Sequence, residues 1–256
     1  MFFEVSALNK RFGGLTAVAD ISFAIARGEI VGIFGPNGSG KTTLLNLICG
    51  MLPPTGGRLV WKDQDVTGLP PHRVAELGIV KTFQNPQLFP ELSVTEHVRI
   101  AGHLRLKRIL GWRRIATLIK AAPDDGKLQQ QVETVLRLCR LSEARNESAL
   151  SLSYGDEKML GVAMALMCEP ELLLLDEPAT GLGHNEIANL GEVLRDLRDH
   201  GTTLCIIDHN VGFLGRLADR AIAMHHGSKI AEGAPSAVLA DRAVIEAYLG
   251  RGAVRA

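Results

Sequence analysis

The sequence predicts an α/β fold with a parallel sheet at its core, and three apolar runs carry that prediction. Residues 29–34, EIVGIF, form a short apolar run that precedes a glycine-rich stretch. Residues 171–178, ELLLLDEP, and residues 202–210, TTLCIIDHN, are two further runs that end in acidic or imidazole side chains. Such uninterrupted runs are typical of strands buried on both faces of a parallel sheet. Ligands bind at the carboxyl ends of strands in open α/β sheets, so the polar residues there are candidates for a site.

The first run leads into GPNGSGKTT, which fits the pattern G-x-x-x-x-G-K-[ST] and is followed by the helical stretch LLNLICG. Its glycines allow backbone N–H groups to curl around a phosphate, and the helix N-terminus adds partial positive charge. We expect Lys41 to reach the β- and γ-phosphates and the Thr42 hydroxyl to bind Mg²⁺, a hard ion that takes oxygen ligands. The spacing favours a nucleotide site over a glycine-rich turn that binds nothing. The residues assigned to the nucleotide are Gly35, Pro36, Asn37, Gly38, Ser39, Gly40, Lys41, Thr42 and Thr43.

The ends of the two later runs supply candidate catalytic groups. Asp176 follows four leucines and is placed to hold Mg²⁺ through a water. Glu177 is a candidate general base that polarises the attacking water. The alternative for both acids is a strand end that caps the next helix. His209 is expected to contact the γ-phosphate or the water, because imidazole both donates and accepts hydrogen bonds near neutral pH; a structural or exposed histidine is the alternative.

Composition excludes several classes of protein. The chain has 256 residues, of which 46% are apolar, enough to bury the core of one large domain or two small ones. Its 28 basic and 28 acidic residues balance, so no overall field favours nucleic acid. Four scattered cysteines in apolar surroundings predict reduced, buried thiols of a cytosolic protein. No signal pattern and no apolar window near the ~18 residues of a membrane span are present, so we expect no insertion into a bilayer.

With GPNGSGKTT, LSYGD (residues 152–156), LLLLDEP and DHN in this order, the sequence resembles the nucleotide-binding subunits of ABC transporters from about Phe3 to Gly250. RFGGLTAV, KTFQNPQLFPELSV and the ending AEGAP…IEAYLG are similar to the LivG-type ATPases of branched-chain amino-acid importers, with urea-importer ATPases as near relatives. The resemblance implies an α/β P-loop NTPase (RecA-like) core with an N-terminal antiparallel β subdomain and an inserted helical subdomain. It implies a single ABC ATPase domain over residues 1–256. Residues 1–84 and 161–256 would form the catalytic core, and residues 85–160 the helical subdomain with the signature motif.

The resemblance also gives LSYGD a role. In this family the matching segment begins a helix and contacts the γ-phosphate of the nucleotide held by the other ATPase subunit. Ser153 offers a hydroxyl, Gly155 allows close approach, and the helix N-terminus points positive charge at phosphate. Ser153 and Asp156 also predict a capping arrangement, and both interpretations can hold. The chain departs from the usual L-S-G-G-Q at Tyr154 and Asp156, and it has Gly183 where the family usually carries an acid or asparagine.

Two more positions are assigned by resemblance. Phe12 matches the aromatic residue that stacks on adenine, with a buried strand-end phenylalanine as the alternative. Gln84 matches the glutamine that joins Mg²⁺ and the attacking water. Residues 85–92 would then line the groove that takes a helix of the membrane subunit.

Two further features of the sequence are a pair of adjacent histidines and a basic segment. His225 and His226 precede Gly227 at a predicted hairpin turn and lack the spacing partners of a metal site. Residues 112–120 place apolar side chains at helical spacing with basic side chains opposite. This predicts a basic amphipathic helix that contacts anionic lipid or the membrane subunit, or, as we favour, one that packs on its subdomain with a solvated basic face.

The sequence therefore predicts the ATP-hydrolysing subunit of an ABC import system for branched-chain amino acids, which uses ATP and Mg²⁺ at the cytoplasmic face of the inner membrane. Expected partners are a second ABC ATPase subunit, in a homo- or heterodimer, permease subunits and, indirectly, a solute-binding protein, without nucleic acid. The alternatives are the ATPase of a urea or amide importer, a nucleotide-binding module with weak hydrolysis, and a soluble ABC ATPase acting on translation or DNA. Glu177 and His209 argue against weak hydrolysis, and a single cassette without a long coiled coil argues against the last.

Overall fold

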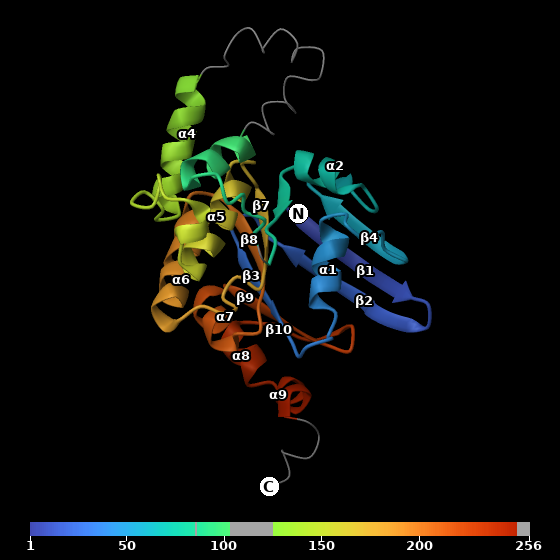
Figure 1. The fold of residues 1–256 in the computed structure, drawn as a ribbon. Helices are drawn as coiled ribbons and strands as arrows, with labels where there is room; N and C mark the ends of the chain where they lie inside the picture. Colours follow the sequence, from blue (N-terminus) through green and yellow to red (C-terminus); the bar gives the residue numbers. More distant parts are fainter. Residues whose placement is uncertain (85, 103–124, 250–256) are drawn as a thin grey trace. The chain divides into compact units, whose positions relative to one another are not determined.

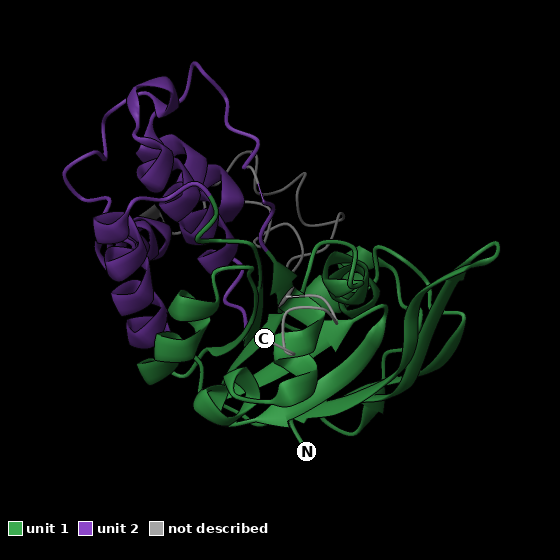
Figure 2. Ribbon diagram, turned by 90° about the horizontal axis from the view of Figure 1, so that it is seen from below, with its two compact units in different colours: residues 1–81, 171–180, 198–256 green, residues 82–170, 181–197 purple. Residues whose placement is uncertain are grey.

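The computed structural model describes residues 1–84, 86–102 and 125–249. The chain divides into two compact units, shown in green and purple in Figure 2: residues 1–81, 171–180 and 198–256 form unit 1, and residues 82–170 and 181–197 form unit 2. Unit 2 contains the range predicted as a helical subdomain together with residues 82–84, 161–170 and 181–197. The functional division into catalytic core and helical subdomain stays a prediction. Asn85 and the predicted basic helix of residues 112–120 lie outside the described residues.

Unit 1 contains two sheets (Figure 1). Its strands are β1 (Phe3–Phe12), β2 (Leu15–Ile25), β3 (Ile30–Phe34), β4 (Gly56–Trp61), β5 (Gln64–Asp65), β6 (Ile79–Lys81), β7 (Leu172–Asp176), β8 (Thr203–Ile207), β9 (Arg220–His225) and β10 (Ser228–Gly233). The larger sheet has the order β10-β9-β3-β8-β7-β6 and is parallel except between β9 and β10. The smaller sheet, β2-β1-β4-β5, is antiparallel. The predicted α/β fold with an N-terminal antiparallel sheet is confirmed.

The three predicted apolar runs are β3, β7 and β8, and every residue of these strands is buried. Strand β3 lies between β8 and β9, with Ile30 opposite Leu204 and Val31 opposite Arg220. Strands in such a position are covered on both faces, which explains why their sequences do not alternate. Strand β8 ends at Ile207, so Asp208 and His209 follow it at the carboxyl edge of the sheet.

The helices of unit 1 are α1 (Lys41–Ile48), α2 (Pro71–Glu76), α7 (Val211–Leu217), α8 (Pro235–Leu239) and α9 (Arg242–Leu249). Helix α1 begins directly after the glycine-rich loop, three residues earlier than the predicted stretch LLNLICG. It inserts Leu44, Leu45 and Ile48 into a core that includes side chains of both sheets. Full burial of each such side chain is worth about 1.5–3 kcal/mol, so this packing fixes the loop to the sheet.

Unit 2 is helical in its described part. Its elements are a helix over residues 94–102, α4 (Asp125–Leu138), the 3₁₀ turn η1 (Ala149–Ser151), α5 (Tyr154–Leu166) and α6 (His184–Asp199), whose last two residues belong to unit 1. Helices α4 and α5 pack together, and both contribute buried apolar side chains. None of the described helices combines the length and apolarity that crossing a membrane requires.

All four cysteines are free thiols. Cys49, Cys139 and Cys205 are buried as predicted, whereas Cys168 is only half-buried. Burial raises the pKa of Cys139 and of Cys205 to about 12, so both stay protonated at neutral pH.

Candidate nucleotide-binding site

The glycine-rich loop joins β3 to α1 in unit 1, and its glycines are required by geometry. Gly38 and Gly40 have φ angles of +78° and +100°, in the left-handed region. A Cβ at Gly40 would lie 2.2 Å from the carbonyl oxygen of Ala17, and one at Gly35 would lie 2.1 Å from that of Met224. Both approaches are to backbone, which cannot move aside easily. Larger residues at 35 and 40 would therefore displace the loop from the sheet.

The hairpin turn between β9 and β10 is hydrogen-bonded to this loop. The N–H of Gly227 donates to the carbonyl oxygen of Ser39 over 3.0 Å, and the N–H of Ala19 donates to the carbonyl of Gly227 over 2.8 Å. The turn thus ties the loop to β2. Ser39 is only 2% exposed, and its hydroxyl has no hydrogen-bond partner within the described part of the chain.

Lys41 is 5% exposed, and its ammonium donates to the carbonyl oxygens of Gly35 at 2.8 Å and Pro36 at 3.1 Å. Burial lowers the pKa of Lys41, while the negative charges of nearby carboxylates, first Glu177 and then Asp176, oppose that shift. The loop therefore surrounds the positively charged side chain of Lys41.

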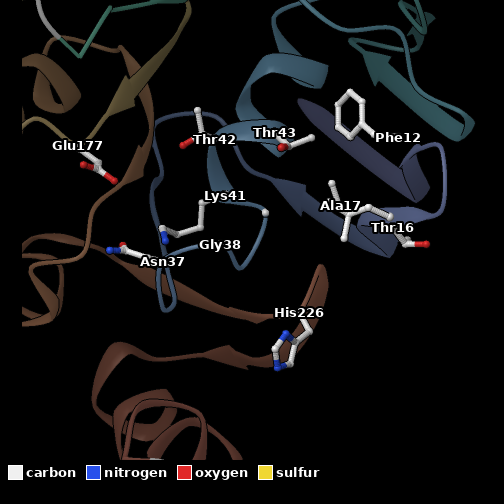
Figure 3. A pocket seen from close by; sticks show the side chains of 12 residues that line it. Phe12, Thr16, Ala17, Asn37, Gly38, Lys41, Thr42, Thr43, Glu177 and His226 are labelled. Carbon is white, nitrogen blue, oxygen red and sulfur yellow. The ribbon is translucent and has the colours of Figure 1, made fainter.

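A cavity of about 610 Å³ opens beside the loop in unit 1 (Figure 3). It is lined by Phe12, Leu15, Thr16, Ala17, Asn37, Gly38, Gly40, Lys41, Thr42, Thr43, Glu177 and His226. In the view of Figure 3, Lys41 lies between Glu177 on one side and Phe12 on the other. Phe12 ends β1 and is 46% exposed, which excludes the alternative of a buried strand-end residue. Its open ring offers a flat face for a base.

Asp176 ends β7 and is 6% exposed. One of its oxygens, Oδ2, lies 2.9 Å from Nζ of Lys81, the last residue of β6. Lys81 also donates to Oδ1 of Asn46 on α1 over 2.7 Å. Nothing in the sequence singled out Lys81, because its partner is brought beside it only by the pairing of β6 with β7.

Glu177 follows β7 with a φ of +50°, an uncommon value for a residue with a side chain. Its N–H donates to the carbonyl of Ile207 over 2.7 Å, which holds the residue at the end of β8. The next helix, α6, begins only at His184, so neither acid caps it as the alternative interpretation required. The backbone instead turns the carboxylate into the cavity.

His209 Nδ1 lies 3.9 Å from Glu177 Oε2. The hydroxyl of Thr180 lies 3.3 Å from that same oxygen and 3.4 Å from Nδ1, so it bridges the two side chains. Thr180 was not predicted, because it has no motif of its own and approaches His209 only through the adjacency of β7 and β8.

Asp208 stabilises the loops at the carboxyl edge of the larger sheet. It is fully buried and accepts the N–H groups of Ala179 at 2.9 Å and Asn210 at 2.8 Å. Burial raises the pKa of Asp208, and these two hydrogen bonds oppose the shift. The carboxylate thus fixes the loops that carry Thr180 and His209.

The remaining predicted residues, Gln84, Ser153 and Gly155, lie in unit 2. Ser153 caps α5: its hydroxyl accepts the N–H of Asp156 at 3.1 Å and donates to the carboxylate of Asp156 at 2.8 Å. The predicted capping arrangement is confirmed. A Cβ at Gly155 would lie 2.5 Å from a carboxylate oxygen of Glu186, so a larger residue there would displace that side chain.

Two other contacts in unit 2 were not foreseen. Lys158, one turn into α5, donates to the carbonyl oxygen of Gln84 and lies 5.3 Å from the ring centroid of Tyr154. Glu186 accepts the N–H of Gly183 over 2.7 Å. The departures at 154 and 183 therefore have defined packing within the unit.

Sequence reasoning also missed two residues around the loop of unit 1. Tyr248 of α9 places its ring 6.3 Å from that of Phe34, the residue before Gly35. Burial raises the pKa of Tyr248, and the backbone N–H of Gly35 opposes that shift. His226 is exposed at the predicted hairpin turn, and it also lines the cavity. Local sequence could not predict that these two residues lie beside the loop, because their positions depend on the long-range pairing of β3 with β9.

The donors present fit a nucleotide with magnesium. A glycine cradle around Lys41 suits a phosphate, and Thr42 and Asp176 supply the oxygen ligands that Mg²⁺ prefers. The described residues contain no cluster of three or more His, Cys, Asp or Glu that would hold a metal alone.

Comparison with known proteins agrees with this site. The ABC transporter family matches residues 18–180, and the family described as branched-chain amino acid ATP-binding cassette transporter matches residues 228–254. The chain is 38% identical to the high-affinity branched-chain amino acid transport ATP-binding protein LivG of Escherichia coli (strain K12), over 96% of this chain and 97% of LivG. It is 36% identical to BraF of Pseudomonas aeruginosa, a protein with the same description, over 96% of this chain and 97% of BraF.

A solved nucleotide-free ATP-binding cassette from an ABC transporter has a TM-score of 0.84 at 29% identity, with 97% of this chain and 99% of that one covered. The ADP conformation of a cassette gives a TM-score of 0.83 at 30% identity, with 97% and 98% covered. The glycine loop, the cavity and these similarities lead to one conclusion: the chain belongs to the ATP-binding subunits of ABC transporters and is an ABC ATPase.

Proposed function

We propose that the chain is the ATP-hydrolysing subunit of an import system for branched-chain amino acids. It acts with a second ABC ATPase subunit on a separate permease at the cytoplasmic face of the membrane. The observation that carries hydrolysis is the cavity of unit 1, where the loop around Lys41 and the carboxylate of Glu177 face the same space. The descriptions of LivG and BraF, and the match over residues 228–254, support the amino-acid substrate.

The loop of unit 1 binds the phosphates. Its backbone N–H groups and the Lys41 ammonium meet the negative charge, and the ring of Phe12 stacks on the base. Thr42 and Asp176 would hold Mg²⁺, which would supply positive charge against the charge that develops on the phosphate oxygens.

Glu177 acts as the general base. Its carboxylate takes a proton from water as the water attacks the terminal phosphorus, and the bond to the departing ADP oxygen breaks. His209 orients this carboxylate and contacts the phosphate, and Thr180 keeps the two at a fixed separation. Positioning of the water, rather than covalent chemistry, supplies most of the acceleration.

The N-terminus of α5 serves the nucleotide of the second subunit. Ser153 and Gly155 place a hydroxyl and closely approachable backbone at the positive end of this helix. ATP is thereby held by both subunits, and cleavage removes the phosphate that they share. The closed dimer then loses its differential contact and opens, which moves the permease.

Replacement Glu177→Gln tests this function because it removes the base and keeps the shape of the side chain. We expect phosphate release to fall at least about 100-fold, while ATP affinity changes less than about threefold. The variant should also form a dimer with Mg-ATP, alone or with its companion ATPase, in light scattering. Glu171→Gln is the matched control, since Glu171 lies before the same strand and pairs with Lys62 outside the cavity. Unchanged hydrolysis in Glu177→Gln would contradict the role given to Glu177.

The substrate is tested with the permease. Membrane and solute-binding proteins that copurify with the chain are reconstituted, and ATP hydrolysis is measured with leucine, isoleucine or valine and, in parallel, with urea. Stimulation by the amino acids alone is expected. Stimulation by urea would reassign the substrate.

The lipopolysaccharide export protein LptB of Acidithiobacillus ferridurans is 30% identical to this chain. Copurification with export components would therefore contradict import.

A further inference from the structure

Lys81 and Asp176 form a buried ion pair in unit 1. The two atoms Nζ and Oδ2 lie 2.9 Å apart, and the side chains are 11% and 7% exposed. The residues are neighbours because β6 pairs with β7 in parallel, with Lys81 opposite Leu174. A contrasting pair in the same unit, Lys62 with Glu171, has a separation of 2.6 Å but side chains that are 42% and 37% exposed.

Asn46 of α1 holds the lysine in place, accepting from Nζ over 2.7 Å. Helix α1 is also the helix that begins with Lys41 and Thr42. The ammonium of Lys81 is therefore fixed from two elements, and both of them carry residues assigned to the nucleotide and its metal. A flexible surface lysine would not be fixed in this way.

The positive charge of Lys81 determines its effect on the buried carboxylate of Asp176. A buried carboxylate without a cation is strongly disfavoured, and removal of one member of a buried pair leaves the other uncompensated. Asp176 must nevertheless be a carboxylate to serve a metal. In the protein without nucleotide, Lys81 supplies the positive charge that this carboxylate requires.

We propose that Lys81 is the resting counter-ion of Asp176, a positioning residue that compensates the carboxylate until Mg²⁺ arrives with the nucleotide. This inference rests on the proposed metal role of Asp176. If so, free Mg²⁺ should bind only weakly at Asp176 in the absence of nucleotide, because Lys81 already compensates the charge of the carboxylate. Loss of Lys81 should make Asp176 responsive to Mg²⁺ alone.

The test is thermal unfolding of the full chain without nucleotide, with and without millimolar Mg²⁺. For Lys81→Met we expect Tm to fall by about 5–10 °C, whereas the matched control Lys62→Met should lose about 2 °C or less. Added Mg²⁺ should recover part of the loss in Lys81→Met and leave the wild type and the control unchanged. Lys81→Arg, which retains the charge, should remain close to the wild type.

A double variant keeps the proposal falsifiable if Lys81→Met does not fold. In Lys81→Met/Asp176→Asn the neutral amide needs no cation, so Tm should return toward that of the wild type and Mg²⁺ should have no effect. The proposal is overturned if Lys81→Met behaves like Lys62→Met, if Mg²⁺ does not raise its Tm, or if the double variant is as unstable as the single one. Since no nucleotide is present, these outcomes are independent of the Glu177→Gln experiment, whose failure would concern hydrolysis alone.

Discussion

His209 Nδ1 and Glu177 Oε2 face each other across 3.9 Å at the carboxyl edge of the parallel sheet. The separation exceeds a hydrogen bond, and the hydroxyl of Thr180 spans it with contacts of 3.3 and 3.4 Å. The orientation of the proposed base therefore depends on a threonine that belongs to no recognised motif.

Thr180→Val tests this bridge, because valine keeps the shape and removes the hydroxyl. We expect kcat for phosphate release to fall about 3- to 10-fold with little change in KM, because the lost hydrogen bond to the Glu177 carboxylate is long, at 3.3 Å. His209→Ala should reduce kcat further, by about 10- to 100-fold. Thr134→Val is the control, since that hydroxyl donates to the carbonyl of Gln130 in its own helix, away from the cavity. A raised KM with unchanged kcat in Thr180→Val would show that the hydroxyl serves binding instead.

Phe12→Ala should weaken ATP binding about 5- to 20-fold, because base stacking on an aromatic ring contributes about 1–3 kcal/mol and this ring is half-exposed. GTP binding should weaken by a similar factor, since a ring face does not distinguish the bases, and Phe12→Tyr should retain affinity. Equilibrium titration with a fluorescent nucleotide measures both. Leu15→Ala removes an apolar side chain from the same cavity without a ring, and an equal loss there would argue against stacking.

Ser153 has a confirmed role as the cap of α5 and a proposed role toward the second subunit's nucleotide, and two substitutions separate them. Ser153→Ala loses the cap, worth about 1 kcal/mol, and should lower Tm by about 2–4 °C. Ser153→Asn keeps a good cap, and its amide N–H can still donate to Asp156, but it removes the hydroxyl, so Tm should hold while ATP-dependent dimer formation and hydrolysis fall. Ser148→Ala, which uncaps the short turn η1 and loses a hydrogen bond to the carbonyl of Pro90, is the control. A fully active Ser153→Asn protein would limit Ser153 to capping.

Tyr248→Phe removes one hydroxyl and keeps the ring against Phe34. The backbone N–H of Gly35, the first residue of the loop, lowers the pKa of this hydroxyl and so interacts with it, and we expect ATP affinity to fall about 2- to 10-fold while Tm stays within about 2 °C. Tyr248→Leu should lower Tm as well, because the ring contact is lost. Unchanged affinity in Tyr248→Phe would show that α9 supports the fold without positioning the loop.

The parts of the site that follow from contiguous sequence could be predicted. The loop from Gly35 to Thr43 has a fixed spacing, and Glu177 directly follows a run that could only be a buried strand. Phe12 needed the resemblance, and its exposure then excluded the buried alternative.

The residues that escaped prediction are those whose partners are distant in the chain. Thr180 meets His209, Lys81 meets Asp176, and Tyr248 meets Gly35 only after strands have paired in the order β9-β3-β8-β7-β6. Composition and periodicity contain no information on that order. Short-range patterns therefore identify the groups that would touch the ligand, and the topology supplies the groups that hold them.

The central place of β3 has a consequence for synthesis on the ribosome. This strand carries the phosphate loop near the start of the chain, yet the strands on its two sides begin only at Thr203 and Arg220. Until those residues have left the exit tunnel, the loop has no flanking backbone to hold it, and non-local pairing of this kind is slow to form. A nascent or prematurely terminated polypeptide that lacks both β8 and β9 thus exposes two unpaired edges of an apolar strand, and it is the species on which chaperones and proteases should act.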